Sequence, residues 1–125
     1  MVVALRPTTP RRRSKNMGTK DVCWMSAIEL TQAYKSGELS PVEALEEILE
    51  RVKRYNPELN AIVTLTEEMA RTAAKQAEKD IKAKKAGALS GIPVTIKDLD
   101  YLRGVRTTFG SKLYENFIPD EDAVV

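Results

Sequence analysis

A short apolar segment that ends in a lysine, residues 91–98 (GIPVTIKD), constrains the fold more than any other part of the sequence. Its large apolar residues recur at every second position, and they are Ile92, Val94 and Ile96. A period of two predicts a strand with one face toward a core and with Thr95 and Lys97 on the other face. Pro93 lacks a backbone N–H group, so it suits only the start or the edge of a strand.

Lys97 allows two interpretations. It can mark the point where the strand leaves the core for solvent, because lysines are rarely fully buried unless they are paired. It can instead be a functional residue, because a lysine beside an apolar strand loses solvation unless it has a partner or a task. Composition alone favours the first interpretation, and the motifs around the lysine favour the second.

Residues 89–125 contain four short motifs in a fixed order: G-I-P-V-x-I-K-D, G-V-R-T-T, G-S-K-L-x-E-N-F and P-x-E-D-A. Three more lie upstream: W-M-S-A-x-E-L, G-E-L-S-P-V-E and N-P-x-L-N-A. Together they resemble the N-terminal part of the amidase signature family, which includes the A subunit of aspartyl/glutamyl-tRNA amidotransferase. The resemblance covers residues 23–125. It departs at Asp100 and Tyr101, where the family usually has an apolar residue followed by an acidic one.

The resemblance implies a catalytic role for Lys97. Enzymes of this family use a serine nucleophile, a second serine in a cis peptide and a lysine, and Lys97 aligns with that lysine. Burial lowers the pKa of a lysine, so a neutral amine can accept a proton through the bridging serine. The activated nucleophile then forms an acyl-enzyme, as in other serine–lysine sites. Both family serines belong to a Gly/Ser-rich segment downstream, so Ser90 and Ser111 are interpreted as turn and cap residues.

Three functional interpretations follow. The first is the N-terminal portion of an amide-bond hydrolase that carries only the lysine of a Ser-cisSer-Lys triad. The second is a catalytically inactive truncated or split-gene product that needs a complementary fragment. The third and weakest is a helical adaptor with a basic nucleic-acid-binding arm. In the first two interpretations the isolated chain is inactive. The resemblance implies a small-molecule amide as the substrate and amidotransferase subunits as partners. Neither nucleic acid nor a membrane is an expected partner.

Composition excludes several other kinds of site. The sequence has no histidine, so Ser/His and Cys/His catalytic pairs and histidine metal sites are excluded. The single cysteine, Cys23, can form neither an internal disulfide nor a usual zinc site. The dispersed glycines form no phosphate-binding loop. We therefore expect no cofactor and no metal. No apolar run is long enough to cross a bilayer, and a cytoplasmic location is expected.

Charge divides the chain. The first 20 residues contain six basic side chains and no acidic one. They hold little apolar content, which predicts a basic disordered tail over residues 1–22. Residues 23–125 are then the N-terminal part of an incomplete amidase domain. An organellar targeting segment within residues 1–20 and a true start at Met17 remain open alternatives.

Helix signals dominate the first half of this region. A capping box of Ser26 and Glu29 predicts a helix over residues 26–36 that Gly37 ends. A second box begins at Ser40, with proline at the first helical position, and predicts a helix that ends before residues 56–57, an Asn-Pro pair. A third helix is expected to start at Thr64 or Thr66 and to run to about residue 86, where a glycine follows.

Two strands and further short elements complete the expectation. Residues 60–65 and 92–97 are predicted strands, a short helix is predicted near Ser111, and an acidic helix start at residues 120–122. The order helix, helix, strand, helix, strand is typical of an α/β protein. The predicted fold is therefore α/β: N-terminal helices plus the first strands of an amidase-signature mixed sheet, in a truncated form. Two short strands alone do not make a stable sheet.

Overall fold

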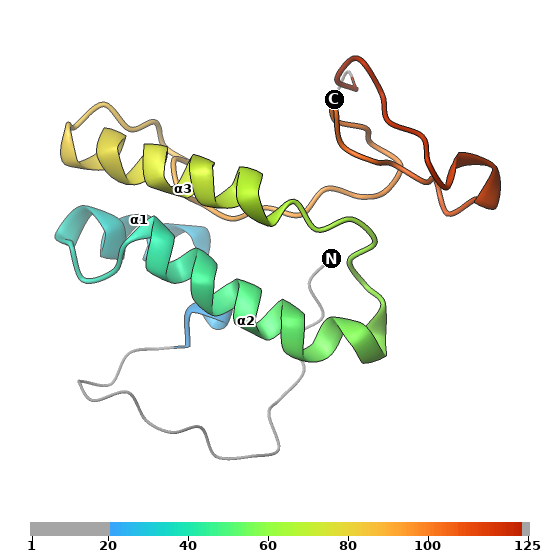
Figure 1. The fold of residues 1–125 in the computed structure, drawn as a ribbon. Coiled ribbons are helices and arrows are strands. Elements are labelled where there is room, and N and C mark those ends of the chain that lie inside the picture. Colours follow the sequence, from blue (N-terminus) through green and yellow to red (C-terminus); the bar gives the residue numbers. More distant parts are fainter. Residues whose placement is uncertain (1–20, 124–125) are drawn as a thin grey trace.

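The structure is a computed structural model, and it describes residues 21–123. The elements in chain order are η1 (Val22–Trp24), α1 (Ala27–Ser36), α2 (Pro41–Leu59), α3 (Glu67–Lys82) and η2 (Lys112–Tyr114). The long helices α2 and α3 lie side by side, and the chain after α3 returns along them to a group of loops (Figure 1). Residues 1–20, most of the predicted basic tail, lie outside the described residues.

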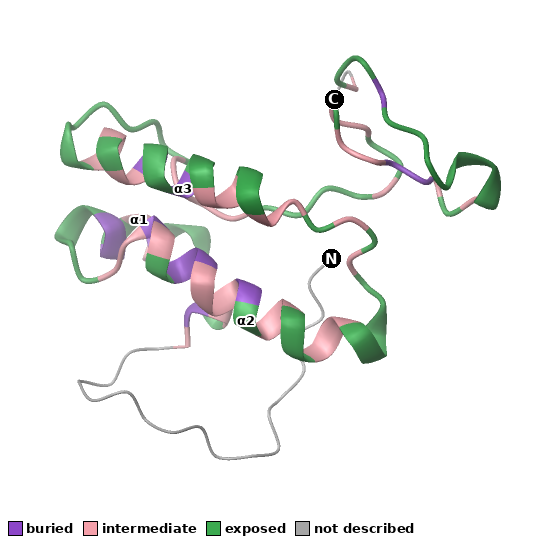
Figure 2. Ribbon diagram, viewed as in Figure 1, coloured by how far each residue is buried: buried purple, intermediate pink, exposed green. Residues whose placement is uncertain are grey.

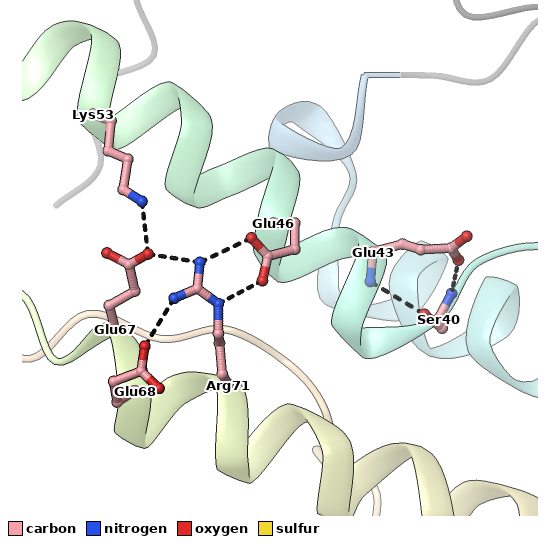
Figure 3. Close-up of polar contacts among 7 residues, drawn as sticks. All are labelled: Ser40, Glu43, Glu46, Lys53, Glu67, Glu68 and Arg71. Carbon is pink, nitrogen blue, oxygen red and sulfur yellow. Dashed lines mark hydrogen bonds and ion pairs between the residues drawn. The ribbon is translucent and has the colours of Figure 1, made fainter.

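Both predicted capping boxes are present. At the start of α1, the Ser26 hydroxyl accepts a hydrogen bond from the Glu29 backbone N–H group (3.3 Å), and the Glu29 carboxylate accepts one from the Ser26 N–H group (2.8 Å). Ser40 and Glu43 repeat the arrangement at the start of α2, with distances of 3.1 and 2.8 Å (Figure 3). Gly37 follows α1 with a left-handed φ of 78°. Local sequence therefore sets where both helices begin.

Helix α2 runs beyond its predicted end. Its last turn includes Pro57, so the expectation that it ends before residues 56–57 is wrong. Asn56 accounts for the extension: its side-chain amide donates to the Ile62 carbonyl (3.0 Å) and its side-chain oxygen accepts from the Ile62 N–H group (2.8 Å). Asn60 adopts a left-handed conformation and donates to the Asn56 carbonyl (2.7 Å). These bonds offset the unfavourable helical conformation before proline.

Helix α3 begins after Thr66, as predicted, but it ends about four residues earlier than expected. The Lys84 N–H group donates to the Ile81 carbonyl (3.0 Å), and the Lys85 N–H group donates to the Asp80 carbonyl (2.8 Å). These two bonds form a Schellman motif, and Lys84 takes the left-handed position with φ of 57°. Lysine therefore occupies the place that we expected a glycine to fill.

An ion-pair network joins α2 to α3 (Figure 3). The Arg71 guanidinium donates to both carboxylate oxygens of Glu46 on α2, at 2.7 and 3.0 Å. On its own helix, Arg71 pairs with Glu67 (2.6 Å) and Glu68 (3.1 Å). Lys53 on α2 also pairs with Glu67, with 2.6 Å between Nζ and Oε1. The planar guanidinium matches the geometry of a carboxylate, and the Arg71–Glu46 and Lys53–Glu67 pairs together connect α2 to α3.

Within residues 21–123, the core is small and consists of two clusters. Val22, Leu30, Tyr34 and Ala44 form the first cluster, and Ile92 packs against it. Leu45, Leu49 and Ala74 form the second, between α2 and α3. Purple segments in Figure 2 mark the buried residues of the helices, and further purple segments lie in the C-terminal loops. On α3, the buried residues are Ala74 and Ala77.

Residues 21–123 contain no strand, so neither predicted strand is formed in this structure. Residues 92–97 instead run as an irregular segment away from the helices (Figure 1). Val94 is 77% exposed and Ile96 is 50% exposed, so the predicted buried face is uncovered beyond Ile92. A strand requires neighbours that accept and donate its backbone hydrogen bonds, and the described residues provide no such pairing here. The described part of the chain is helical.

The C-terminal elements agree in part with expectation. The predicted short helix near Ser111 is the 3₁₀ helix η2, and the Ser111 hydroxyl accepts from the Leu113 N–H group (3.3 Å). The predicted helix start at residues 120–122 is wrong. The Asp122 side chain instead accepts a hydrogen bond from the Arg103 N–H group (2.8 Å), which directs it into a loop contact. No helix in the described region is long and apolar enough to cross a membrane.

Candidate functional site

Lys97 lies where the irregular segment enters the C-terminal loops. Its carbonyl accepts a hydrogen bond from the Asp100 N–H group (2.9 Å), which closes a turn over residues 97–100. The lysine side chain is exposed. Among the described residues, none forms a hydrogen bond or ion pair with Lys97 Nζ. The backbone turn therefore fixes the position of the Lys97 Cα atom, from which the side chain extends.

The residue after the lysine fastens that turn to a second loop. Asp98 Oδ1 accepts from the Thr108 backbone N–H group (2.8 Å), and Asp98 Oδ2 accepts from the Thr108 hydroxyl. The Gly110 N–H group in turn donates to the Thr108 hydroxyl oxygen (3.2 Å). We call these three residues the Asp98 clamp. Thr108 is buried, so its polar groups depend on these partners.

The charge of Asp98 is favoured by the clamp. Partial burial raises the pKa of the Asp98 carboxyl group, but the hydrogen bonds from Thr108, the Gly110 backbone and the Arg106 charge outweigh that effect. The net result is a pKa below the ordinary value for aspartate. Asp98 is therefore a carboxylate at neutral pH and serves as an acceptor.

Arg106 connects the same loops to the segment before α3. Its guanidinium donates to the Val63 carbonyl (2.8 Å) and to the Glu115 carbonyl (3.0 Å). Its own carbonyl accepts from the Thr64 hydroxyl (3.0 Å). The loop that holds the Asp98 clamp is thus fixed at both sides, and Lys97 stands at its beginning.

Aromatic side chains of these loops pack against one another. Phe109 lies at the centre, with ring-centroid distances of 6.4 Å to Tyr101, 5.1 Å to Tyr114 and 6.0 Å to Phe117. Two backbone bonds add to this packing, from Gly104 to Pro119 (2.8 Å) and from Thr107 to Phe117 (3.0 Å). The region after Lys97 is therefore ordered by contacts that regular secondary structure does not provide.

Ser90 and Ser111 are occupied by local structural roles. The Ser90 hydroxyl oxygen accepts from the Gly87 N–H group (2.9 Å), and Ser111 caps η2. The structure therefore brings neither serine to Lys97 by a hydrogen bond. No group of three or more histidine, cysteine, aspartate or glutamate residues in positions 21–123 could hold a metal ion.

Sequence reasoning missed the importance of Asp98. In the structure Asp98 links two of the motifs. The signal was the pairing of K-D in one motif with T-T in the next, because a carboxylate and two threonines are natural hydrogen-bonding partners. Asp98 and Thr108 are ten positions apart in the sequence, so spacing alone did not reveal the contact.

Comparison with known proteins now identifies the family. The model of the amidase family matches residues 43–125. The A subunit of the glutamyl-tRNA(Gln) amidotransferase of Thermoanaerobacter pseudethanolicus is 42% identical over 97 residues, which are 78% of this chain and 20% of that protein. The protein of the same name from Caldanaerobacter subterraneus subsp. tengcongensis is 44% identical over 97 residues, with the same coverage of both chains.

A third relative agrees. The corresponding A subunit of Geobacter metallireducens is 43% identical over 94 residues, 75% of this chain and 19% of that protein. The chain therefore spans about a fifth of the length of the curated relatives it matches. Because the family match covers most of the chain and contains both Lys97 and the Asp98 clamp, the chain belongs to the amidase signature family.

Proposed function

We propose that this chain acts as the N-terminal portion of an amide-bond hydrolase and supplies the lysine of a Ser-cisSer-Lys triad through Lys97. The observation that carries the proposal is the family match over residues 43–125, which includes the lysine motif and every motif after it. The two serines of the triad come from protein other than residues 1–125. The chain alone then hydrolyses no amide, because a base without a nucleophile lacks the covalent step.

Residues 92–97, here called the lysine segment, are exposed from Val94 onward, and this exposure supports the proposal. Val94, Ile96 and Leu99 are each at least half exposed around Lys97. A strand without its neighbouring strands would leave its apolar side chains exposed in this way. We propose that further protein pairs with residues 92–97, completes an α/β sheet and covers these residues. The same burial would disfavour the charged ammonium and favour the neutral amine that the proton transfer needs.

The relatives suggest the setting in which the chain works. They are named as A subunits of an amidotransferase that acts on glutamyl-tRNA(Gln). We propose that the substrate of this chain's site is a small amide, and that the protein works beside other amidotransferase subunits. A catalytically inactive fragment that needs a complementary piece is the second candidate, and the exposed apolar segment favours it equally.

A chimera separates these candidates. The chain would replace the matching 97-residue segment of the Thermoanaerobacter pseudethanolicus relative, and the product would be combined with that relative's own partner subunits. Ammonia released from an amide such as glutamine is measured. An active chimera shows that this chain can support catalysis when the remainder is present. An inactive but folded chimera favours the inactive-fragment candidate.

Variants of the active chimera test Lys97 directly. Lys97→Ala should lower the rate by about 10²- to 10⁴-fold, the usual contribution of a general base. Lys97→Arg should also fail, because arginine stays protonated in proteins. Lys112→Arg, at an exposed position, is the matched control and should keep the parental rate. Near-parental turnover in Lys97→Arg would show that the lysine does not carry the proton.

A further inference from the structure

Gly91 occupies a position that no side chain can share. Its φ is +82°, in the left-handed region that residues with a Cβ atom rarely adopt. A Cβ atom at this position would lie 2.8 Å from Pro41 Cγ, 3.0 Å from Pro41 Cβ and 3.4 Å from Tyr34 Cε2. Pro41 is the first residue of α2, and Tyr34 belongs to α1. The backbone at Gly91 therefore lies directly against both helices.

The other left-handed glycines lack such contacts. Gly37, Gly104 and Gly110 have φ values between +66° and +78°, and an added Cβ atom at each would meet nothing within 4 Å. Their conformation explains the choice of glycine. At Gly91, close approach to the helices is an additional reason. Both neighbours are buried, with Tyr34 only 4% exposed.

Gly91 is also the last residue before the lysine segment. Ile92 packs against the first core cluster, and its N–H group donates to the Leu89 carbonyl (3.1 Å). Six residues run from Ile92 to Lys97, a reach of about 20 Å at full extension. The Asp98 clamp holds the far end. The lysine segment is thus attached at both ends, and Gly91 forms the attachment to the helices.

We propose that Gly91 is a positioning residue for Lys97: its close contact with Pro41 and Tyr34 fixes the origin of the segment that carries the lysine. The inference rests on the proposed function of Lys97. It adds that the helical layer aligns the base, and that it does so through a backbone contact rather than a side chain. Displacement of residue 91 from the helices moves the lysine segment without removing any catalytic group.

Hydrogen exchange in this chain tests the attachment independently of catalysis. NMR would follow the Ser90 and Ile92 amides, which donate the turn hydrogen bonds on either side of Gly91. Gly91→Ala should make them exchange at least tenfold faster. Gly37→Ala is the matched control, because it has nearly the same φ and no close neighbour, and these two amides should keep their rates. Equal effects of the two variants would overturn the attachment.

A second variant isolates the steric contact. Pro41→Ala removes Cγ, the nearest atom, and alanine suits the start of a helix. The double variant Gly91→Ala/Pro41→Ala should therefore recover part of the slow exchange that Gly91→Ala loses. The effects of the two single variants on exchange at the Ser90 and Ile92 amides can also simply add in the double variant. In that case the contact with Pro41 does not hold the segment.

Kinetics of the chimera test the positioning role. Gly91→Ala should lower kcat about tenfold, leave KM unchanged, and recover in part when Pro41→Ala is added. In a Lys97→Ala background the same glycine change should have no further effect on kcat, because it acts through the lysine. An equal loss in both backgrounds would overturn the positioning role. Full activity of Lys97→Ala would overturn the proposed function instead, and the exchange result would still stand.

Discussion

The Asp98 clamp offers the sharpest test of how the lysine turn is held. In Asp98→Ala, the buried Thr108 loses the acceptor for its backbone N–H group and for its hydroxyl. A hydrogen bond to a charged group contributes about 1.5–3 kcal/mol, so two would contribute about 3–6 kcal/mol. Asp98 is only partly buried, and water can replace it as an acceptor. We therefore expect a local loss of about 2 kcal/mol.

That loss should appear as faster local opening. A change of about 2 kcal/mol corresponds to about a 30-fold change in an opening equilibrium, since 1.36 kcal/mol is tenfold. Hydrogen exchange of the Thr108 and Gly110 amides should accelerate by that factor in Asp98→Ala, while amides in α2 keep their rates. Asp100→Ala is the matched control, because its exposed carboxylate lies two residues away and outside the clamp. Equal exchange at Thr108 in both variants would refute the clamp.

The clamp should also depend on pH with a definite sign. The folded pKa of Asp98 is lower than the ordinary value, so its contribution to stability is present above the unfolded pKa of about 3.9. It is lost as the pH falls through the lower folded pKa. Thr108 exchange, corrected for its intrinsic pH dependence, should therefore lose protection below about pH 4 in the parent chain. Asp98→Asn should show a weaker dependence, and an unchanged one would contradict the assignment.

Two further predictions concern the helices. Leu49→Ala should lower the free energy of unfolding by about 2–3 kcal/mol, measured by urea titration followed by circular dichroism, since Leu49 is 4% exposed and the small core can partly collapse. Leu113→Ala is the control: Leu113 is 85% exposed, so the free energy of unfolding should change by less than about 0.5 kcal/mol. Equal losses in the two variants would contradict the core assignment. The hydrogen bond from Arg71 lowers the pKa of Glu46. The α2–α3 network therefore stabilises the folded chain above the pKa that Glu46 has in the unfolded chain, and this contribution is lost as the pH falls through the lower pKa of the folded chain. Arg71→Gln should therefore reduce the drop in urea midpoint between pH 7 and pH 3, whereas Arg103→Gln should not.

Local signals in the sequence predicted the helices well. The capping boxes at Ser26 and Ser40 are formed by residues three apart, and such contacts need no distant partner. The end of α2 was misjudged, because the side-chain bonds from Asn56 to Ile62 overcome the preference of the residue before proline. The end of α3 was misjudged for a similar reason, since Lys84 adopts a conformation that glycine usually takes.

The lysine region shows what local signals leave out. The alternation of Ile92, Val94 and Ile96 predicts a strand, but a strand becomes stable only when other strands pair with it. The family was recognisable from the motifs, because several short motifs in one order are specific, and the role of Lys97 stays a prediction. The clamp between Asp98 and Thr108 and the contact between Gly91 and Pro41 join distant parts of the chain. Such contacts depend on the folded path, which periodicity does not encode.

The packing of the one tryptophan has a practical consequence. Trp24 in η1 lies under the Arg51 guanidinium of α2, 5.7 Å from its carbon to the ring centroid, and the same guanidinium carbon lies 5.6 Å from the ring centroid of Tyr55. Indole emission is sensitive to a nearby cation and to water. Tryptophan fluorescence therefore reports on one packing contact, the contact between η1 and α2. It can be followed in real time without any label, while circular dichroism reports the helices as a whole.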